Sequence, residues 1–201
     1  MIARFRFAIA VAFVALLGLV APSALRANEI TNGNFAAGGL GWSTTQTDGN
    51  YPWGFGYNGS YYYASTGCIG QPCITGPVGN EADLFQDITT VAGDSYTLSF
   101  SYLSEEPTNE LEALFGSTVA LDLPNLDTTS LVNYTVSGLV ATSTTTEVDF
   151  LGRQDPSFDE LTNVDVENNG PATVTPEPSS MLLFGTFLAG AFGAVRRKLR
   201  V

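Results

Sequence analysis

The sequence has no histidine and few basic residues. Its 201 residues include only eight lysines and arginines, against 20 acidic residues, and only two cysteines. Without histidine the chain cannot build a Ser-His-Asp or Cys-His nucleophile, a histidine-ligated metal site or a histidine general base. Residues 28–175 also lack lysine, which excludes Schiff-base and P-loop chemistry there. We therefore expect no catalytic residues and no enzymatic activity.

The few cations are concentrated at the two ends of the chain. Residues 28–175 hold nineteen of the acidic residues and a single cation, Arg153, so this segment carries a net charge of −18. Such a segment would repel a phosphate backbone, which excludes nucleic acid as a partner. Arg153 stands beside Asp155 at the end of an expected strand, and we expect the two to form an ion pair.

Two groups of carboxylates have the composition of a glycosidase acid and base. A glycosidase needs one acid whose pKa is raised by burial. Both groups sit among polar and turn residues, so we expect solvated, mostly ionised carboxylates instead. The groups are Glu105, Glu106, Glu110 and Glu112, and Asp155, Asp159 and Glu160.

The first 27 residues have the organisation of a secretory signal peptide. Two arginines precede the apolar run 7–20, and small residues and a proline follow it. We expect cleavage after Ala27 or Ala24, with Ala27 preferred. The alternative, an uncleaved membrane anchor, is disfavoured because the run is shorter than the roughly 20 residues that a membrane span needs.

A second apolar segment lies near the other end of the chain. A linker begins at residue 171, and residues 179–195 are expected to form a transmembrane helix. The basic tail 196–201 follows at once and would stay in the cytoplasm. Because cations flank both apolar segments, we expect residues 28–170 to be exported across the inner membrane.

The junction before this expected span carries a recognisable motif. Pro176, Glu177 and Pro178 precede the span, and Arg196 and Arg197 follow it. This arrangement resembles the PEP-CTERM sorting signal of Gram-negative bacteria. The resemblance, over residues 175–201, implies processing by an exosortase, a membrane transpeptidase that recognises the motif and passes the protein outward. It also implies a transient membrane anchor, followed by release to the cell surface or the extracellular space.

The middle of the chain consists of short β-type runs separated by Gly, Pro, Asn and Asp. Alternation is clearest in 95–102, where every second residue is a large apolar or aromatic one. Many short alternating runs of this kind predict an antiparallel all-β sandwich. The other expected strands are 29–35, 41–47, 61–65, 84–90, 112–115, 118–123, 131–137, 146–151 and 161–166.

Three motifs in this region resemble galactose-binding-like jelly rolls. Asn32-Gly33-Asn34-Phe35, followed by Gly41-Trp42, resembles their opening. Residues 85–100 resemble their central hairpin, with the turn at Ala92-Gly93, and residues 158–166 resemble their closing strand. The resemblance implies a jelly-roll-like antiparallel β-sandwich over residues 28–170.

Relatives of this fold often hold a structural calcium ion, but this chain departs from their ligand pattern. The positions of the family's acidic residues hold Ala36, Thr162 and Asn163, which removes hard oxygen ligands. The resemblance therefore transfers no calcium site. We expect no cofactor and no defined metal site, and a structural calcium ion stays an open alternative. Cys68 and Cys73 are expected to form a disulfide in the exported segment. The loop they close is short, so the bond would stabilise the fold by only about 2 kcal/mol.

Residues 51–63 contain seven aromatic residues among glycines. Aromatic faces stack on sugar rings, which makes this segment a candidate glycan site with Trp53, Tyr57 and Tyr62 as platforms and Asn58 as polar partner. Alternatively, the alternate tyrosines simply face the core.

We expect a structural or adhesive protein of the cell surface or extracellular matrix. The alternative function is a carbohydrate-binding module that recognises exopolysaccharide.

Overall fold

The computed structural model describes residues 27–45, 52–67 and 81–172. Most of the expected signal peptide, the Cys68–Cys73 pair and the sorting signal with its span and basic tail lie outside these residues, so those predictions stay predictions. Nowhere in the described ranges is there a helix with the length and hydrophobicity that crossing a bilayer requires.

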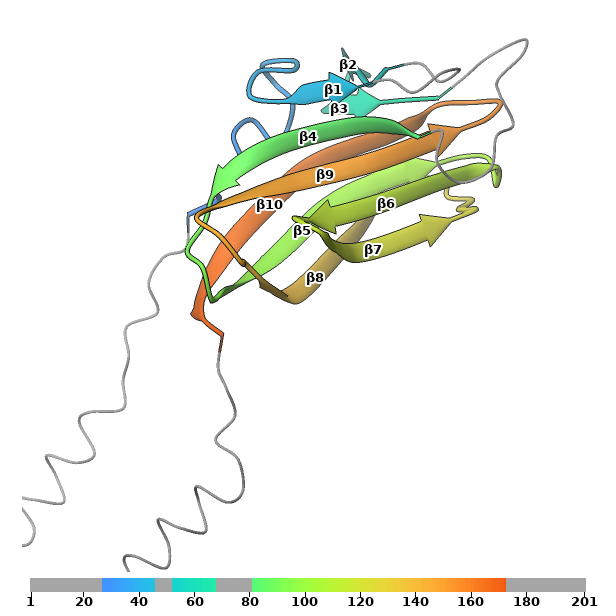
Figure 1. Ribbon diagram of the computed structural model, residues 1–201. Coiled ribbons are helices and arrows are strands. Elements are labelled where there is room, and N and C mark those ends of the chain that lie inside the picture. Colours follow the sequence, from blue (N-terminus) through green and yellow to red (C-terminus); the bar gives the residue numbers. More distant parts are fainter. Residues whose placement is uncertain (1–26, 46–51, 68–80, 173–201) are drawn as a thin grey trace, which may run out of the picture.

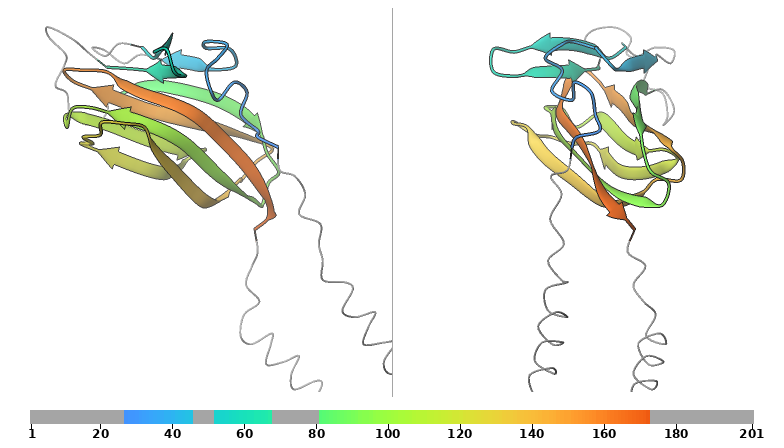
Figure 2. Two further views of the ribbon diagram at one scale, coloured as in Figure 1. Left: turned by 180° about the vertical axis from the view of Figure 1, so that it is seen from behind. Right: turned by 90° about the vertical axis from the view of Figure 1, so that its left-hand side faces the viewer.

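The described residues form two antiparallel sheets packed face to face, which confirms the predicted all-β jelly-roll sandwich (Figures 1 and 2). The first sheet has the strand order β1 (Ser43–Thr45), β4 (Ala82–Thr89), β9 (Thr145–Gln154), β6 (Asn109–Phe115), β7 (Thr118–Pro124). The second sheet has the order β2 (Gly54–Tyr57), β3 (Tyr62–Ser65), β10 (Asp159–Pro171), β5 (Asp94–Ser104), β8 (Val132–Val140).

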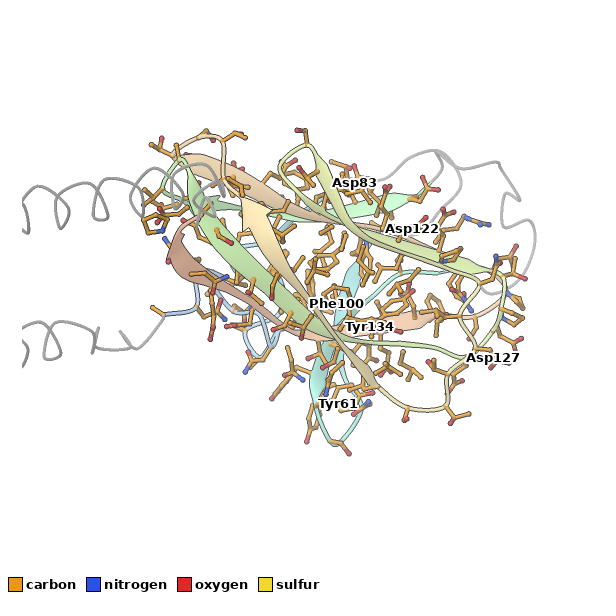
Figure 3. All side chains as sticks on the ribbon, turned by 90° about the horizontal axis from the view of Figure 1, so that it is seen from below. Tyr61, Asp83, Phe100, Asp122, Asp127 and Tyr134 are labelled. Atoms are coloured by element: carbon orange, nitrogen blue, oxygen red, sulfur yellow. The ribbon has the colours of Figure 1, made fainter. Side chains whose placement is uncertain are left out.

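The core lies between the sheets and is built from the alternating residues of each strand. In β5 the residues expected on one face are buried, and Phe100 packs edge-on against Phe150 of β9 with ring centroids 5.2 Å apart. Phe100 also stacks on Tyr134 of the edge strand β8, which is partly buried against the core; the two residues are labelled side by side in Figure 3. Each such buried ring stabilises the fold by about 2–3 kcal/mol, because it leaves water.

β4 and β5 do not form the predicted hairpin. The turn itself is present, since the amide of Asp94 donates to the carbonyl of Val91 at 3.0 Å and Gly93 has a φ of 88°. However, β4 pairs with β1 and β9, whereas β5 pairs with β10 and β8. The connection therefore crosses from one sheet to the other. Both strands have an apolar face, and this crossing lets the two faces cover each other across the core.

The expected strand 29–35 is also wrong. Only Asn28 makes an isolated bridge, to Glu167, and the chain then turns. The amide of Phe35 donates to the carbonyl of Asn32 at 3.0 Å, and both residues have positive φ angles. Phe35 is nevertheless buried, so its apolar character reflects a core position within a turn. β2, in contrast, was not expected, because its two glycines interrupt the apolar alternation.

The two ends of the described chain leave the sandwich together. Asn28 lies beside Glu167, and Pro171 pairs with Asp94 at the end of β10 (Figures 1 and 2). β10 begins at the opposite end of the sandwich, where it follows the loop at Phe158. The strand has 13 residues and is therefore roughly 40 Å long.

Candidate functional site

The aromatic segment singled out in the sequence forms the hairpin of β2 and β3 at the edge of the second sheet. Its turn is fixed by Asn58, whose Oδ1 accepts hydrogen bonds from the amides of Ser60 at 3.1 Å and Tyr61 at 3.2 Å. Gly59 follows with a φ of 96°, a conformation that glycine adopts without strain. The register that results pairs β2 with β3 along their whole length.

Strand alternation divides the side chains of this hairpin between two faces. Ala64 is fully buried, so residues that share its face point to the core side. These include Phe55, which lies directly opposite Ala64 in the register. The outer face then carries Gly54 and Gly56 of β2 and the alternate residues of β3, which are Tyr63 and Ser65.

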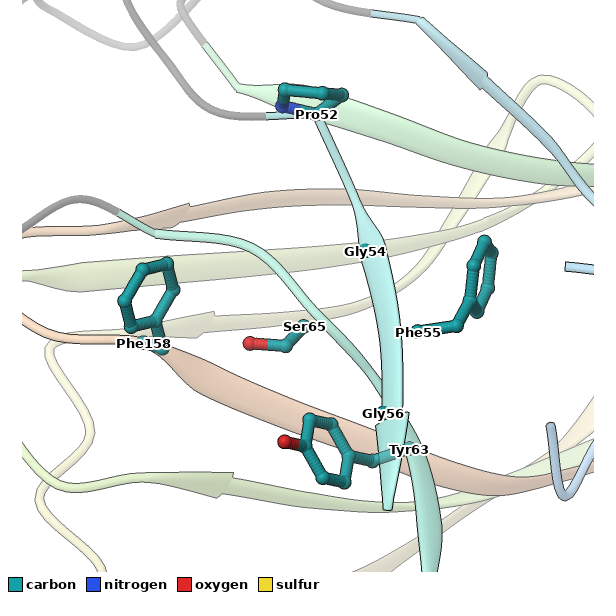
Figure 4. Close-up of a pocket in the computed structure, with 7 residues that line it drawn as sticks. All are labelled: Pro52, Gly54, Phe55, Gly56, Tyr63, Ser65 and Phe158. Atoms are coloured by element: carbon teal, nitrogen blue, oxygen red, sulfur yellow. The ribbon is translucent and has the colours of Figure 1, made fainter. Parts of the chain in front are cut away.

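The outer face of the hairpin contains a shallow hollow of about 360 Å³. Tyr63 and Phe158 stand on the same side of β2, whereas Phe55 projects to the other side (Figure 4). Phe158 comes from the loop before β10 and is 41% exposed. The lining residues are Pro52, Gly54, Phe55, Gly56, Tyr63, Ser65 and Phe158.

The two glycines of β2 shape this hollow in different ways. A Cβ atom at Gly56 would lie 2.7 Å from the ring of Tyr63, so the ring covers this glycine closely. A Cβ atom at Gly54 would find no atom nearer than 3.9 Å, so the space above Gly54 is free. The hollow therefore has a floor without side chains between two aromatic walls.

Polar groups border the hollow on the side of β10. Leu161 pairs with Ala64, which in an antiparallel register places Glu160 beside Ser65. One carboxylate oxygen of Glu160, Oε2, accepts hydrogen bonds from the hydroxyl of Tyr61 and from Nδ2 of Asn58, the latter at 3.4 Å. Partial burial and the carboxylate of Glu160 raise the pKa of Tyr61 to about 12, so its hydroxyl stays a donor.

Of the predicted glycan-binding residues, Trp53 is corrected by the structure. Its side chain is only 3% exposed, and its indole Nε1 donates to the carbonyl of Ala82 at 2.7 Å. The ring lies against the backbone of Gly152 on β9, where an added Cβ would come within 2.4 Å of it. Trp53 therefore packs in the core and offers no face to a ligand. It shares the core-facing side with Phe55, which alternation dictates.

Tyr57 and Tyr62 are exposed, at 55% and 43%, but lie on the face opposite to the hollow. Their rings pack with centroids 4.6 Å apart, and the hydroxyl of Tyr57 donates to the carbonyl of Gly59 at 2.8 Å. The structure thus brings these two predicted residues together as a separate aromatic pair. Asn58 lies in the turn between them and reaches Glu160.

Sequence reasoning missed the two walls of the hollow. Tyr63 was within the aromatic segment but was not selected, and Phe158 is distant in sequence. Alternation around Ala64, a small residue suited to the core, indicates that the neighbouring Tyr63 points to the outer face. No local signal identified Phe158, because only the pairing of Gly67 with Phe158 brings its loop to β3.

Asp159 is not the solvated carboxylate that we expected. It is fully buried at the start of β10, where it accepts hydrogen bonds from the amide of Thr66 at 2.9 Å and the hydroxyl of Tyr102 at 2.8 Å. Burial raises its pKa to about 7, although both hydrogen bonds act in the opposite direction. Since the side chain is closed off from solvent, it joins the strands beneath the hollow and cannot reach a substrate.

The first sheet carries a second unexpected carboxylate. Partial burial, with Asp83 and Glu147 nearby, raises the pKa of Asp149 to about 7. Asp83 and Asp122 of this sheet lie on the side of the sandwich opposite to Tyr61 (Figure 3). Within the described ranges, no group of three or more acidic or cysteine side chains has the arrangement of a metal site.

Arg153 has a different partner from the one expected. It lies opposite Glu110 in the pairing of β9 with β6, and its Nη2 is 3.7 Å from Oε2 of Glu110. Asp155, the expected partner, follows the end of β9, where no cross-strand register brings it to the guanidinium. The cation therefore serves the first sheet and not the hollow.

No protein-family model and no curated protein matches this chain. Solved structures do match it, and one is the carbohydrate-binding module TmCBM61 in complex with β-1,4-galactotriose. That module is 9% identical, with 71% of this chain and 99% of the module covered and a TM-score of 0.54. Another is the K3 cleaved adhesin domain of Lys-gingipain from Porphyromonas gingivalis, at 17% identity, 71% and 98% coverage and a TM-score of 0.53.

The chain is also similar to the enzymatically active domain of tailspike protein 4 from bacteriophage CBA120. The identity is 16% and the TM-score 0.50, with 70% of this chain covered but only 21% of the tailspike chain. At such identities the similarities establish the fold alone. This protein has the jelly-roll sandwich that carbohydrate-binding modules also have.

Proposed function

We propose that this domain binds glycan chains, without catalysis, at the hollow between Tyr63 and Phe158. The observation that carries the proposal is the open floor at Gly54 between two aromatic walls. Sugar rings present apolar C–H faces that pack on aromatic rings, while their hydroxyls need polar partners at the border. Ser65 and Glu160 supply such partners. The volume of about 360 Å³ is near the lower end of ligand pockets, which run from about 300 to 1,000 Å³.

The fold supports the same class of ligand. TmCBM61 holds β-1,4-galactotriose on a sandwich of this kind. A shallow site should bind weakly, because a disaccharide at about 0.3 kcal/mol per non-hydrogen atom reaches a Kd no tighter than about 10 µM. Useful retention on a polymer would then come from many copies engaging one chain.

Filling the hollow tests this proposal. Gly54→Val places a branched side chain where a Cβ has room and where a strand favours valine. We expect at least tenfold weaker glycan binding, measured by isothermal titration or affinity electrophoresis, with an unchanged melting temperature. Tyr57→Ala is the matched control on the opposite face of the hairpin and should leave binding intact. If Tyr57→Ala abolishes binding and Gly54→Val does not, the aromatic pair of Tyr57 and Tyr62 is the site.

We further propose that the domain works outside the cell after export and exosortase processing. The placement of the chain ends supports this role. Asn28 and Pro171 lie at one end of the sandwich and the loop of Phe158 at the other (Figure 1). A protein attached through either end would therefore hold its hollow away from the attachment point.

Mass spectrometry of the mature protein tests the processing. We expect a first residue near Asn28 and a last residue near Pro178 in cells that contain the transpeptidase. Cells without it should retain the C-terminal segment on the protein. An intact C-terminal segment in the mature protein of normal cells would contradict processing and indicate a permanent anchor.

A further inference from the structure

Glu160 occupies a special position among the acidic residues of this protein. It is two residues after Phe158 and lies beside Ser65, both of which line the hollow, so strand alternation places it on the face where the aromatic walls stand. Its side chain is partly buried. The hydroxyl of Tyr61 and Nδ2 of Asn58 both donate to Oε2, which fixes the carboxylate. No described residue makes a hydrogen bond to Oε1 of Glu160, which leaves that oxygen available to a ligand.

No cation of the described residues balances this carboxylate. The only basic residue of the described segments is Arg153, which is on β9 of the other sheet and pairs with Glu110. The hollow itself is lined by uncharged residues. A glycan that carries carboxylate, sulfate or phosphate groups would therefore meet a negative charge and no positive one. A glycan that carries protonated amines would meet a fixed acceptor of the opposite charge.

We propose that Glu160 is a specificity-determining residue that makes the hollow select amino-sugar glycans and reject acidic ones. This inference rests on the proposed glycan binding and adds the charge of the ligand. The recognition has two parts. The rings of Tyr63 and Phe158 hold the sugar face, and the carboxylate of Glu160 receives the ammonium group.

The test compares three β-1,4-linked hexamers of different charge: neutral glucose, cationic glucosamine and anionic mannuronate, which also differs from glucose in its configuration at C2. Titrations are run at about pH 6 and low salt, where the glucosamine amines are protonated. We expect the glucosamine hexamer to bind about fivefold tighter than the glucose hexamer, as for a partly exposed ion pair. The mannuronate hexamer should bind more weakly than the glucose hexamer. High salt should bring the three affinities together.

Glu160→Gln removes the charge but keeps an amide oxygen that can accept from Tyr61 and Asn58. It should lower the affinity for the glucosamine hexamer about fivefold, leave the glucose hexamer within twofold and strengthen the mannuronate hexamer. Glu167→Gln is the matched control, since it removes one charge from the distant part of β10. It should change the three affinities much less than Glu160→Gln does, because seven strand residues place its charge roughly 23 Å from Glu160.

The possible results separate the role of Glu160 from glycan binding itself. If the glucose hexamer binds and the glucosamine hexamer binds no tighter, or if Glu160→Gln and Glu167→Gln behave alike, the role of Glu160 is refuted while glycan binding stands. If wild type binds none of the hexamers, and also binds no neutral glycan in the titrations that compare it with Gly54→Val, then glycan binding itself is refuted. The role of Glu160 is then refuted with it.

Discussion

The buried carboxylate of Asp159 should make this protein more stable in mild acid than in mild base. In the unfolded chain its pKa has the ordinary value of 3.8, and burial in the folded protein raises it to about 7. Because the folded state has the higher pKa, it holds the proton more tightly than the unfolded state. The free energy of unfolding therefore falls as the pH rises from about 4 to about 7.

The size of this effect follows from the difference between the two pKa values. Each pKa unit is worth about 1.4 kcal/mol, so Asp159 alone accounts for a loss of about 4 kcal/mol across the interval. Asp149 also has a raised pKa, about 7, and acts in the same direction. Its contribution is smaller because solvent screens this partly exposed group. A loss of this size is a large part of the stability of a typical domain.

Urea unfolding followed by tryptophan fluorescence measures the effect, since Trp42 and Trp53 are both buried. The free energy of unfolding is determined at several pH values between about 4 and 8 for wild type and for Asp159→Asn. Asparagine has the same shape, its carbonyl oxygen can accept from the amide of Thr66, and its NH₂ can donate to the hydroxyl oxygen of Tyr102. We expect the variant to lose most of the pH dependence.

Asp127→Asn serves as the control, because it neutralises an exposed carboxylate. It should keep the dependence on pH that wild type shows. A wild-type protein that is equally stable at both ends of the pH range would refute the reasoning. So would an Asp159→Asn variant with the full wild-type dependence, because the loss would then come from general repulsion among the acidic residues and not from the buried one.

Two further predictions concern backbone contacts in the core. Gly33→Ala should destabilise the fold by about 3 kcal/mol in urea unfolding, since the added Cβ would lie 1.9 Å from the carbonyl oxygen of Val164. Gly54→Ala is the control and should change stability little, because the nearest atom to its Cβ is 3.9 Å away. Equal losses of stability in the two variants would contradict this account. Trp53→Phe should lower the free energy of unfolding by about 1–2 kcal/mol, because the hydrogen bond to the carbonyl of Ala82 is lost. Its glycan affinity should equal that of wild type. A loss of affinity without a loss of stability would place Trp53 at the site.

The strands were largely predictable from the sequence, because alternation is a local property. The run 95–102 lies within β5, and its alternate side chains are buried as expected. The turn at Gly93 was predictable as well, since its residues favour turns. The pairing across that turn was not. A strand pattern specifies one apolar face but not which sheet it completes, and here β4 and β5 belong to different sheets.

The candidate site shows the same division. The sequence predicted the aromatic segment as the site, but the prediction selected Trp53, Tyr57 and Tyr62 as sugar platforms and left out Tyr63. Both choices depended on which face of the β2–β3 hairpin meets the core, and that is decided by the contact of Ala64 with β10. The burial of individual acidic residues could not be predicted from the sequence either. Asp159 is adjacent to the partly exposed Glu160, yet it is closed off by Thr66 and Tyr102.

The sequence by itself determined the class of fold, the positions of most strands, the acidity of the domain and the absence of histidine chemistry. These depend on composition and on periodicity over a few residues. Only the tertiary structure decided which rings are exposed, which carboxylate is buried and that Phe158 stands across from Tyr63. These depend on contacts between segments about one hundred residues apart, as in the pairing of Leu161 with Ala64, and no local pattern encodes them.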